Sequence, residues 1–97
     1  MAMIIGTGRI ELHLPGVRSL KEKRSILKGV IARLHKEFNL SCGEVEHHDV
    51  WQSAGLGLAV VSTSSAQAER VLMAALRWVE DNRPDLEVVD YEIEIIY

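Results

Sequence analysis

The sequence has little cysteine, no long apolar run and few aromatic residues, and each shortage excludes a class of protein. Cys42 is the only cysteine among the 97 residues, so no internal disulfide can form and a reducing cytoplasm is the expected location. No apolar run approaches the roughly 20 residues that a membrane-spanning helix needs. The first residues lack the basic start and small-residue cleavage site of a signal peptide. We therefore expect a cytoplasmic protein with no membrane partner.

The composition that remains is that of an ordinary globular domain. Hydrophobic residues make up 47% of the chain and charged residues 26%, which argues against wholesale disorder. A chain of this length forms one domain, and neither a linker nor a low-complexity tract divides it. The prediction is a single domain over residues 1–97.

The net charge of −3 conceals a separation of charge along the chain. Residues 18–38 contain seven basic and two acidic side chains, whereas residues 80–97 contain one basic and seven acidic side chains. Such a separation favours two electrically different surfaces, one of them suited to an anionic partner.

Alternation of apolar and polar residues predicts four strands. These are expected over residues 3–14, 40–50, 55–63 and 86–97. The second strand alternates less cleanly, and we expect a bulge at Gly43. In the last strand the parity that includes Val89 and Tyr91 is expected to face the core.

Helical periodicity predicts two helices between these strands. Ser19 and Glu22 form a capping box at the start of the first helix, which should end near Phe38 with a left-handed cap at Asn39. Ser64 or Ser65 should cap the second helix, which ends before Pro84.

The resulting order, strand–helix–strand–strand–helix–strand, is that of the ferredoxin-like α+β sandwich. Two right-handed crossovers then give a four-stranded antiparallel sheet with both helices on one face and the first and third strands in its centre.

The basic start of the first helix is the strongest functional candidate. Phosphate contacts need positive charges at spaced points, and basic residues in a first turn oppose the helix dipole, which favours a functional reason for them. The alternative is a solvated charged face. The candidate nucleic-acid contacts are Arg18, Lys21, Lys23, Arg24 and Lys28.

Three other groups of residues carry less weight. The loop that ends at Arg18 resembles the anion-binding loop of small acylphosphatases, but residues 40–49 lack the asparagine of that pattern. His47 and His48 point to opposite faces of a strand, so with Asp49 they do not form a closed metal site. Cys42 is expected to be a packing residue. We therefore predict no catalytic residue, metal or cofactor.

The open sheet face lacks the aromatic side chains on which RNA-recognition motifs stack bases. Small residues there would let a protein partner or a second copy approach closely. The candidate interface residues are Thr7, Arg9, Gly57 and Ala59. The two tryptophans, Trp51 and Trp78, are expected either in the core or at an interface, and the core is the simpler interpretation.

These motifs together resemble the small bacterial YlxP-like proteins, also called the domain-of-unknown-function 503 family. The resemblance is carried by residues 19–24 (SLKEKR), 38–39 (FN), 44–45 (EV), 49–51 (DVW) and 55–60 (GLGLAV). It implies a ferredoxin-like fold and no established activity. Genes of that family often lie beside those for translation and ribosome-maturation factors, so the resemblance also implies association with RNA or ribosomes.

The sequence thus predicts a binding module rather than an enzyme. The leading expectation is attachment to RNA or a ribosomal particle through the first helix. The alternative is a homodimeric protein-interaction module that uses the open sheet face, and a remote alternative is a small acylphosphatase-like hydrolase that uses Arg18.

Overall fold

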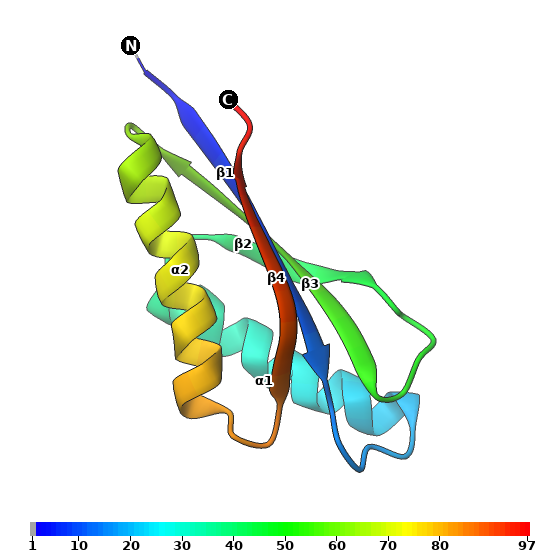
Figure 1. The fold of residues 1–97 in the computed structure, drawn as a ribbon. Helices are drawn as coiled ribbons and strands as arrows, with labels where there is room; N and C mark the ends of the chain where they lie inside the picture. The colour runs from blue at the N-terminus through cyan, green and yellow to red at the C-terminus, as the bar shows by residue number, and fades with distance from the viewer. Residues whose placement is uncertain (1) are drawn as a thin grey trace.

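A computed structural model describes residues 2–97 and has the predicted order of elements (Figure 1). The elements are β1 (Ile4–His13), α1 (Leu20–Glu37), β2 (Ser41–Glu46), β3 (Ser53–Ser62), α2 (Ser65–Asn82) and β4 (Glu87–Ile95). The four strands form one antiparallel sheet in the order β2-β3-β1-β4, with β1 and β3 central. The ferredoxin-like α+β fold is confirmed.

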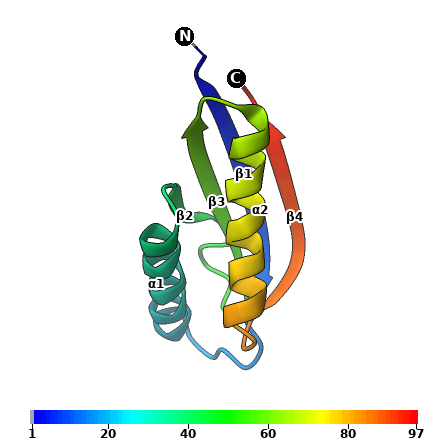
Figure 2. The same cartoon turned by 90° about the vertical axis from the view of Figure 1, so that its left-hand side faces the viewer.

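The two helices divide the covered face of the sheet between them. α2 packs along β1, β3 and β4, whereas α1 packs against β2 at the edge (Figure 2). β2 is thus an edge strand with α1 beside it, and β4 is the other edge strand. Within residues 2–97, neither helix combines the length and apolar character that crossing a membrane requires.

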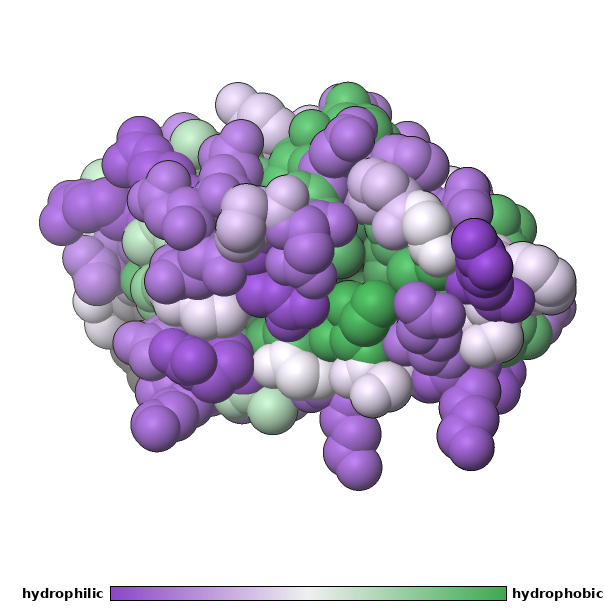
Figure 3. All heavy atoms as spheres, turned by 90° about the horizontal axis from the view of Figure 1, so that it is seen from below, coloured by the Kyte–Doolittle hydropathy of each residue, from purple (hydrophilic) through white to green (hydrophobic). Residues whose placement is uncertain are grey.

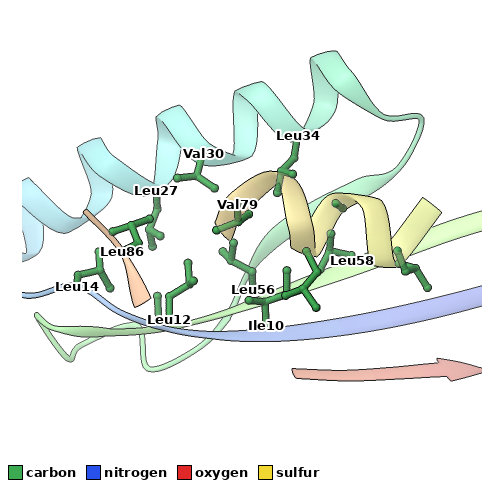
Figure 4. Close-up of a cluster of buried hydrophobic side chains, with 14 of the residues drawn as sticks. Ile10, Leu12, Leu14, Leu27, Val30, Leu34, Leu56, Leu58, Val79 and Leu86 are labelled. Carbon is green, nitrogen blue, oxygen red and sulfur yellow. The ribbon is translucent and has the colours of Figure 1, made fainter. Parts of the chain in front are cut away.

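The core lies between the helices and the two central strands. Leu12 and Leu56 from the sheet meet Val30 and Leu34 from α1 and Val79 from α2, and all five are almost fully buried (Figure 4). The alternation along β1 explains the arrangement, because Ile10 and Leu12 point into this core while the residues between them point to the open face.

Serine side chains begin both helices as predicted. The Ser19 Oγ accepts a hydrogen bond from the Glu22 N–H at 3.0 Å, and the Ser64 Oγ accepts one from the Gln67 N–H at 3.0 Å. The Glu22 carboxylate reaches back to the Arg18 N–H at 3.3 Å, one residue earlier than a standard capping box.

The end of α1 differs from the prediction. The left-handed cap at Asn39 is wrong, because His47 is the one non-glycine residue with positive φ in the described chain. Instead Phe38 is extended (φ −133°), and its N–H donates to the Leu34 carbonyl. The chain therefore bends at Phe38 and Asn39 into β2, and neither residue is in the left-handed conformation.

The expected bulge in β2 lies two residues later than predicted. The register against β3 shifts between Glu44 and Glu46 rather than at Gly43. Glu44 therefore pairs with the core residue Leu56 and points to the face of the sheet that the helices cover. Val45 points to the open face and covers Gly57 there. This small displacement carries a carboxylate underneath α1.

A second bulge lies in β4, and the alternation of residues there does not predict it. Val88 pairs with Leu12 and Asp90 with Glu11, so Val89 is the extra residue. The expectation that Val89 and Tyr91 are core residues is wrong, since both are about half exposed at the edge of the sheet. Val88 takes the inner position instead.

Removing either serine cap should destabilise the protein by a similar amount. We expect Ser19→Ala and Ser64→Ala each to lower the free energy of unfolding by about 1 kcal/mol, because each leaves a backbone N–H without its partner. Ser25→Ala, at an exposed position inside α1, is the control and should not lower the free energy of unfolding. Urea denaturation measures all three, and equal stability of the cap variants and the control would contradict the assignment.

Candidate nucleic-acid interface on the first helix

Four basic side chains lie along one flank of α1. At 3.6 residues per turn, Lys21, Arg24, Lys28 and His35 fall within about 60° of one another, over a length of about 21 Å. All four are exposed. We call these four residues the basic flank.

The basic flank borders an open groove between α1 and the β2 edge. Arg24, Lys28 and His35 line it together with Glu44 of β2, and its volume is about 390 Å³. Leu27 and Ile31 contribute apolar surface to it. Seen from below, this end of the molecule shows hydrophilic side chains around a hollow in which hydrophobic atoms are visible (Figure 3).

The charges of the basic flank are not neutralised within the protein. Among residues 2–97, no salt bridge includes Lys21, Arg24 or Lys28. On another side of the helix Arg33 pairs with Glu37 at 3.2 Å and lies over the Trp78 ring, 5.2 Å from its centroid. Two of the unpaired cations, Arg24 and Lys28, thus line the groove.

Arg18 is exposed just before the cap of α1, and its guanidinium also has no salt-bridge partner in the described chain. The backbone of its loop is less available. The Arg18 N–H donates to Glu22 and the Val17 N–H to the Leu14 carbonyl at 3.4 Å, so both are occupied. The loop therefore offers an anion a side chain rather than a cradle of free N–H groups.

Lys23 does not belong to this surface, contrary to the sequence-based prediction. Its side chain is fully buried (0% exposed). The Nζ donates to the carbonyls of His47 at 2.5 Å and Val50 at 2.8 Å, and it lies 2.7 Å from Glu44 Oε2. Lys23 is therefore a structural residue and makes no phosphate contact.

The Glu44 contact is an ion pair without hydrogen-bond geometry. Two of the three ammonium N–H groups donate to the carbonyls, and Glu44 Oε2, 2.7 Å from the Nζ, has no partner of hydrogen-bond geometry among residues 2–97. Lys23 occupies the core spacing of α1, one turn before Leu27 and two before Val30. That spacing is the signal in the sequence that could have identified it as buried.

The residues that follow β2 form a turn rather than a metal site. The His47 ring lies 3.2 Å from Glu11 Oε1, and the His48 ring contacts the Glu44 carbonyl at 3.1 Å. No three histidine, cysteine or acidic residues gather around one point in the described part of the chain. Burial raises the pKa of Cys42 to about 11, so the thiol is protonated at neutral pH and a poor nucleophile.

The open face of the sheet is acidic around a single arginine. Arg9 lies 3.2 Å from Glu46, 3.3 Å from Asp90 and 3.6 Å from Glu11. Glu92, at 3.9 Å, is a fourth acidic neighbour. Arg9 is thus held by its own chain, and this face would repel phosphate.

The other interface candidates surround Arg9 on the central strands. Thr7 pairs with Ala59 and Arg9 with Gly57 across β1 and β3. A Cβ added to Gly57 would lie 2.8 Å from Val45 Cγ1, so the space above this glycine is already filled by β2. Ala59 is exposed, and Thr7 is partly buried.

Comparison with known proteins gives one family and one curated relative. The model of the family described as "Protein of unknown function (DUF503)" matches residues 5–93. "Uncharacterized protein YlxP" of Bacillus subtilis (strain 168) is 37% identical over 84 residues, which are 87% of this chain and 90% of that protein.

Two solved structures, both of designed proteins, are similar to this chain. The de novo designed protein Foldit4 superposes with a TM-score of 0.52 at 14% identity, over 98% of this chain and 97% of its own. Ferredog-Diesel, also designed de novo, covers 93% of this chain and 83% of its own, with a TM-score of 0.49 and 14% identity. At such low identity, the likeness to Foldit4 shows the fold alone.

Replacing the buried lysine should destabilise the protein strongly. We expect Lys23→Met to lower the free energy of unfolding by about 3 kcal/mol, because Glu44 and two carbonyls lose their partner. Lys21→Met, on the exposed basic flank, should change it by less than about 0.5 kcal/mol. Urea denaturation of both variants is the measurement.

A double-mutant cycle separates the ion pair from the two carbonyl bonds. Lys23→Met with Glu44→Leu should cost less than the sum of the single variants, since neither charge is then left unpaired. Strict additivity would show that Lys23 and Glu44 do not interact.

Proposed function

The chain belongs to the DUF503 family of proteins of unknown function, and we propose that it binds RNA, free or within a ribosomal particle, through the basic flank of α1. The observation that carries the proposal is the row of basic side chains beside an open groove, formed by the unpaired cations Arg24 and Lys28 and by His35. Lys21 continues the row towards the start of the helix.

The spacing of the basic flank suits a phosphate chain. Lys21, Arg24 and Lys28 lie on consecutive turns, about 5 Å apart along the axis. Each cation that meets a phosphate releases condensed counterions, so a few such contacts give useful affinity at low salt. The apolar side chains of Leu27 and Ile31 in the groove offer the bases a surface away from water.

The electrostatics of the molecule favour one orientation. The acidic open face of the sheet lies on the side opposite the helices, with Glu11, Glu46 and Asp90 around Arg9. RNA attracted by the helix would be repelled by that face.

The side chains of the basic flank favour binding without sequence preference. Lysine and arginine contacts to phosphate fix position and carry no information on base identity. The groove contains no asparagine or glutamine that would pair with base edges. We therefore expect similar affinity for unstructured RNAs of different sequence.

The decisive variant replaces Lys21, Arg24 and Lys28 together by alanine. If each contacts one phosphate, the slope of log K against log salt should become shallower by about 2, since each contact contributes about 0.7 for single strands. Fluorescence anisotropy with a labelled oligouridylate of about 12 nucleotides, measured at several salt concentrations, gives the slope.

A charge-matched control removes three cations elsewhere. Lys36, Arg70 and Arg77 are exposed and lie off the groove, so their triple alanine variant should keep the parent slope. Equal losses in both triple variants would mean that only net charge matters. Unchanged binding by the Lys21/Arg24/Lys28 variant would overturn the proposal.

A homodimeric interaction module is the second candidate, and an exposed apolar group at one end of the open face favours it. Val61 is 68% exposed and Ile96 54% exposed. Both flank Ile5, which pairs with Val61 and whose carbonyl accepts a bond from the Ile96 N–H. Apolar side chains on adjacent strands suit contact with a second copy.

If this apolar end forms a dimer, Val61→Asp should shift the protein to monomer. Sedimentation velocity across a wide concentration range measures the change, with Val89→Asp on the exposed β4 edge as the control. A parent protein that stays monomeric at the highest concentration would contradict the dimer.

A further inference from the structure

Trp51 lies exposed at the tip of the turn between β2 and β3. Its side chain is 51% exposed, and its neighbour Val50 is 47% exposed. Trp78, in contrast, is packed against the core with Arg33 over its ring. Of the two positions that the sequence left open, core or interface, the core is thus excluded for Trp51. Leaving so large an apolar ring in water is costly.

The turn that carries Trp51 is fixed rather than loose. The buried ammonium of Lys23 holds the carbonyls of His47 and Val50, and thus the turn before Trp51. His47 is in the left-handed region (φ 62°), a conformation that costs a non-glycine residue about 1–2 kcal/mol. A turn held against such strain presents its exposed ring in a defined place.

The same contacts place Trp51 beside the start of α1. Val50 is bonded to Lys23, and the Gln52 amide donates to the Val17 carbonyl at 3.1 Å. Val50 and Gln52, the neighbours of Trp51, are therefore bonded to Lys23 and Val17. Arg18 and Lys21 lie between Val17 and Lys23 in the sequence. Figure 1 shows this turn and the first turns of α1 at the same end of the molecule.

We propose that the Trp51 ring is a stacking platform for an unpaired base of single-stranded RNA whose phosphates lie on Arg18 and the basic flank. The proposal rests on the proposed function and narrows its ligand. A base can stack on an aromatic ring only when its face is free, so a duplex, whose bases are already stacked, cannot use Trp51. The adjacent cations favour a polyanion over an apolar protein partner.

The experiment follows the fluorescence of Trp51 itself. The chain has two tryptophans, so Trp78→Phe leaves Trp51 as the only one. In that background we expect a single-stranded oligouridylate of about 12 nucleotides to quench the emission at low salt. Inorganic polyphosphate of similar charge has no bases and should compete for binding without quenching. Equal quenching by polyphosphate would overturn the proposal.

Two substitutions at position 51 test the ring. Trp51→Ala should weaken oligouridylate binding by about 5- to 150-fold while leaving the salt slope unchanged, because stacking involves no phosphate. Trp51→Phe keeps an aromatic ring and should retain most of the affinity. A duplex RNA of equal length should bind both variants as it binds the parent.

The outcomes distinguish this proposal from the one on which it rests. If the Lys21/Arg24/Lys28 variant loses binding and Trp51→Ala does not, the stacking role is overturned and the basic flank stands. If the oligouridylate binds no form of the protein, the proposed function fails and stacking with it. A protein that dimerises only with Trp51 present, and binds no RNA, assigns the ring to a protein interface and overturns both.

Discussion

The buried contact of Lys23 is the constraint on which the rest of this surface depends. A single ammonium group joins α1, the inward-facing Glu44 of β2 and the turn between β2 and β3. A charge without exposure to water is tolerated only when polar partners replace its hydration, and two carbonyls and a carboxylate do so here. Those partners exist because Glu44, which precedes the β2 bulge, keeps the inward alternation of Cys42, and because His47 adopts a left-handed conformation.

The position of α1 follows from the same contact. α1 packs against the edge strand β2, while α2 covers the centre of the sheet. A helix at a sheet edge keeps one flank open to solvent, and here that flank carries Lys21, Arg24, Lys28 and His35. The acidic cluster around Arg9 occupies the other face of the sheet. The charge separation along the chain thus becomes a separation between two faces, which is the arrangement expected of a domain that binds a polyanion on one side.

Several polar groups near α1 already have partners within the protein. Cys42 is held as a thiol by burial, the His47 and His48 rings are bonded within the chain, and the loop before Arg18 uses two of its N–H groups internally. The proposed ligand site therefore relies on side chains without such partners: cations on α1, the Arg18 guanidinium and the exposed Trp51 ring.

The sequence by itself determined the order of the elements, the sheet topology, both serine caps and the basic flank, because these follow from local periodicity and capping chemistry. The sequence also placed Lys23 at the spacing of the core residues of α1. The positive charge of its side chain nevertheless led to the prediction of a surface position. Only the tertiary structure decided the two bulges, since one extra residue in a strand is set by pairing with a partner strand and leaves no clear local pattern. For the same reason it alone decided that Glu44 turns inward to Lys23, that Val45 fills the space over Gly57 and that Trp51 stands exposed beside the first helix.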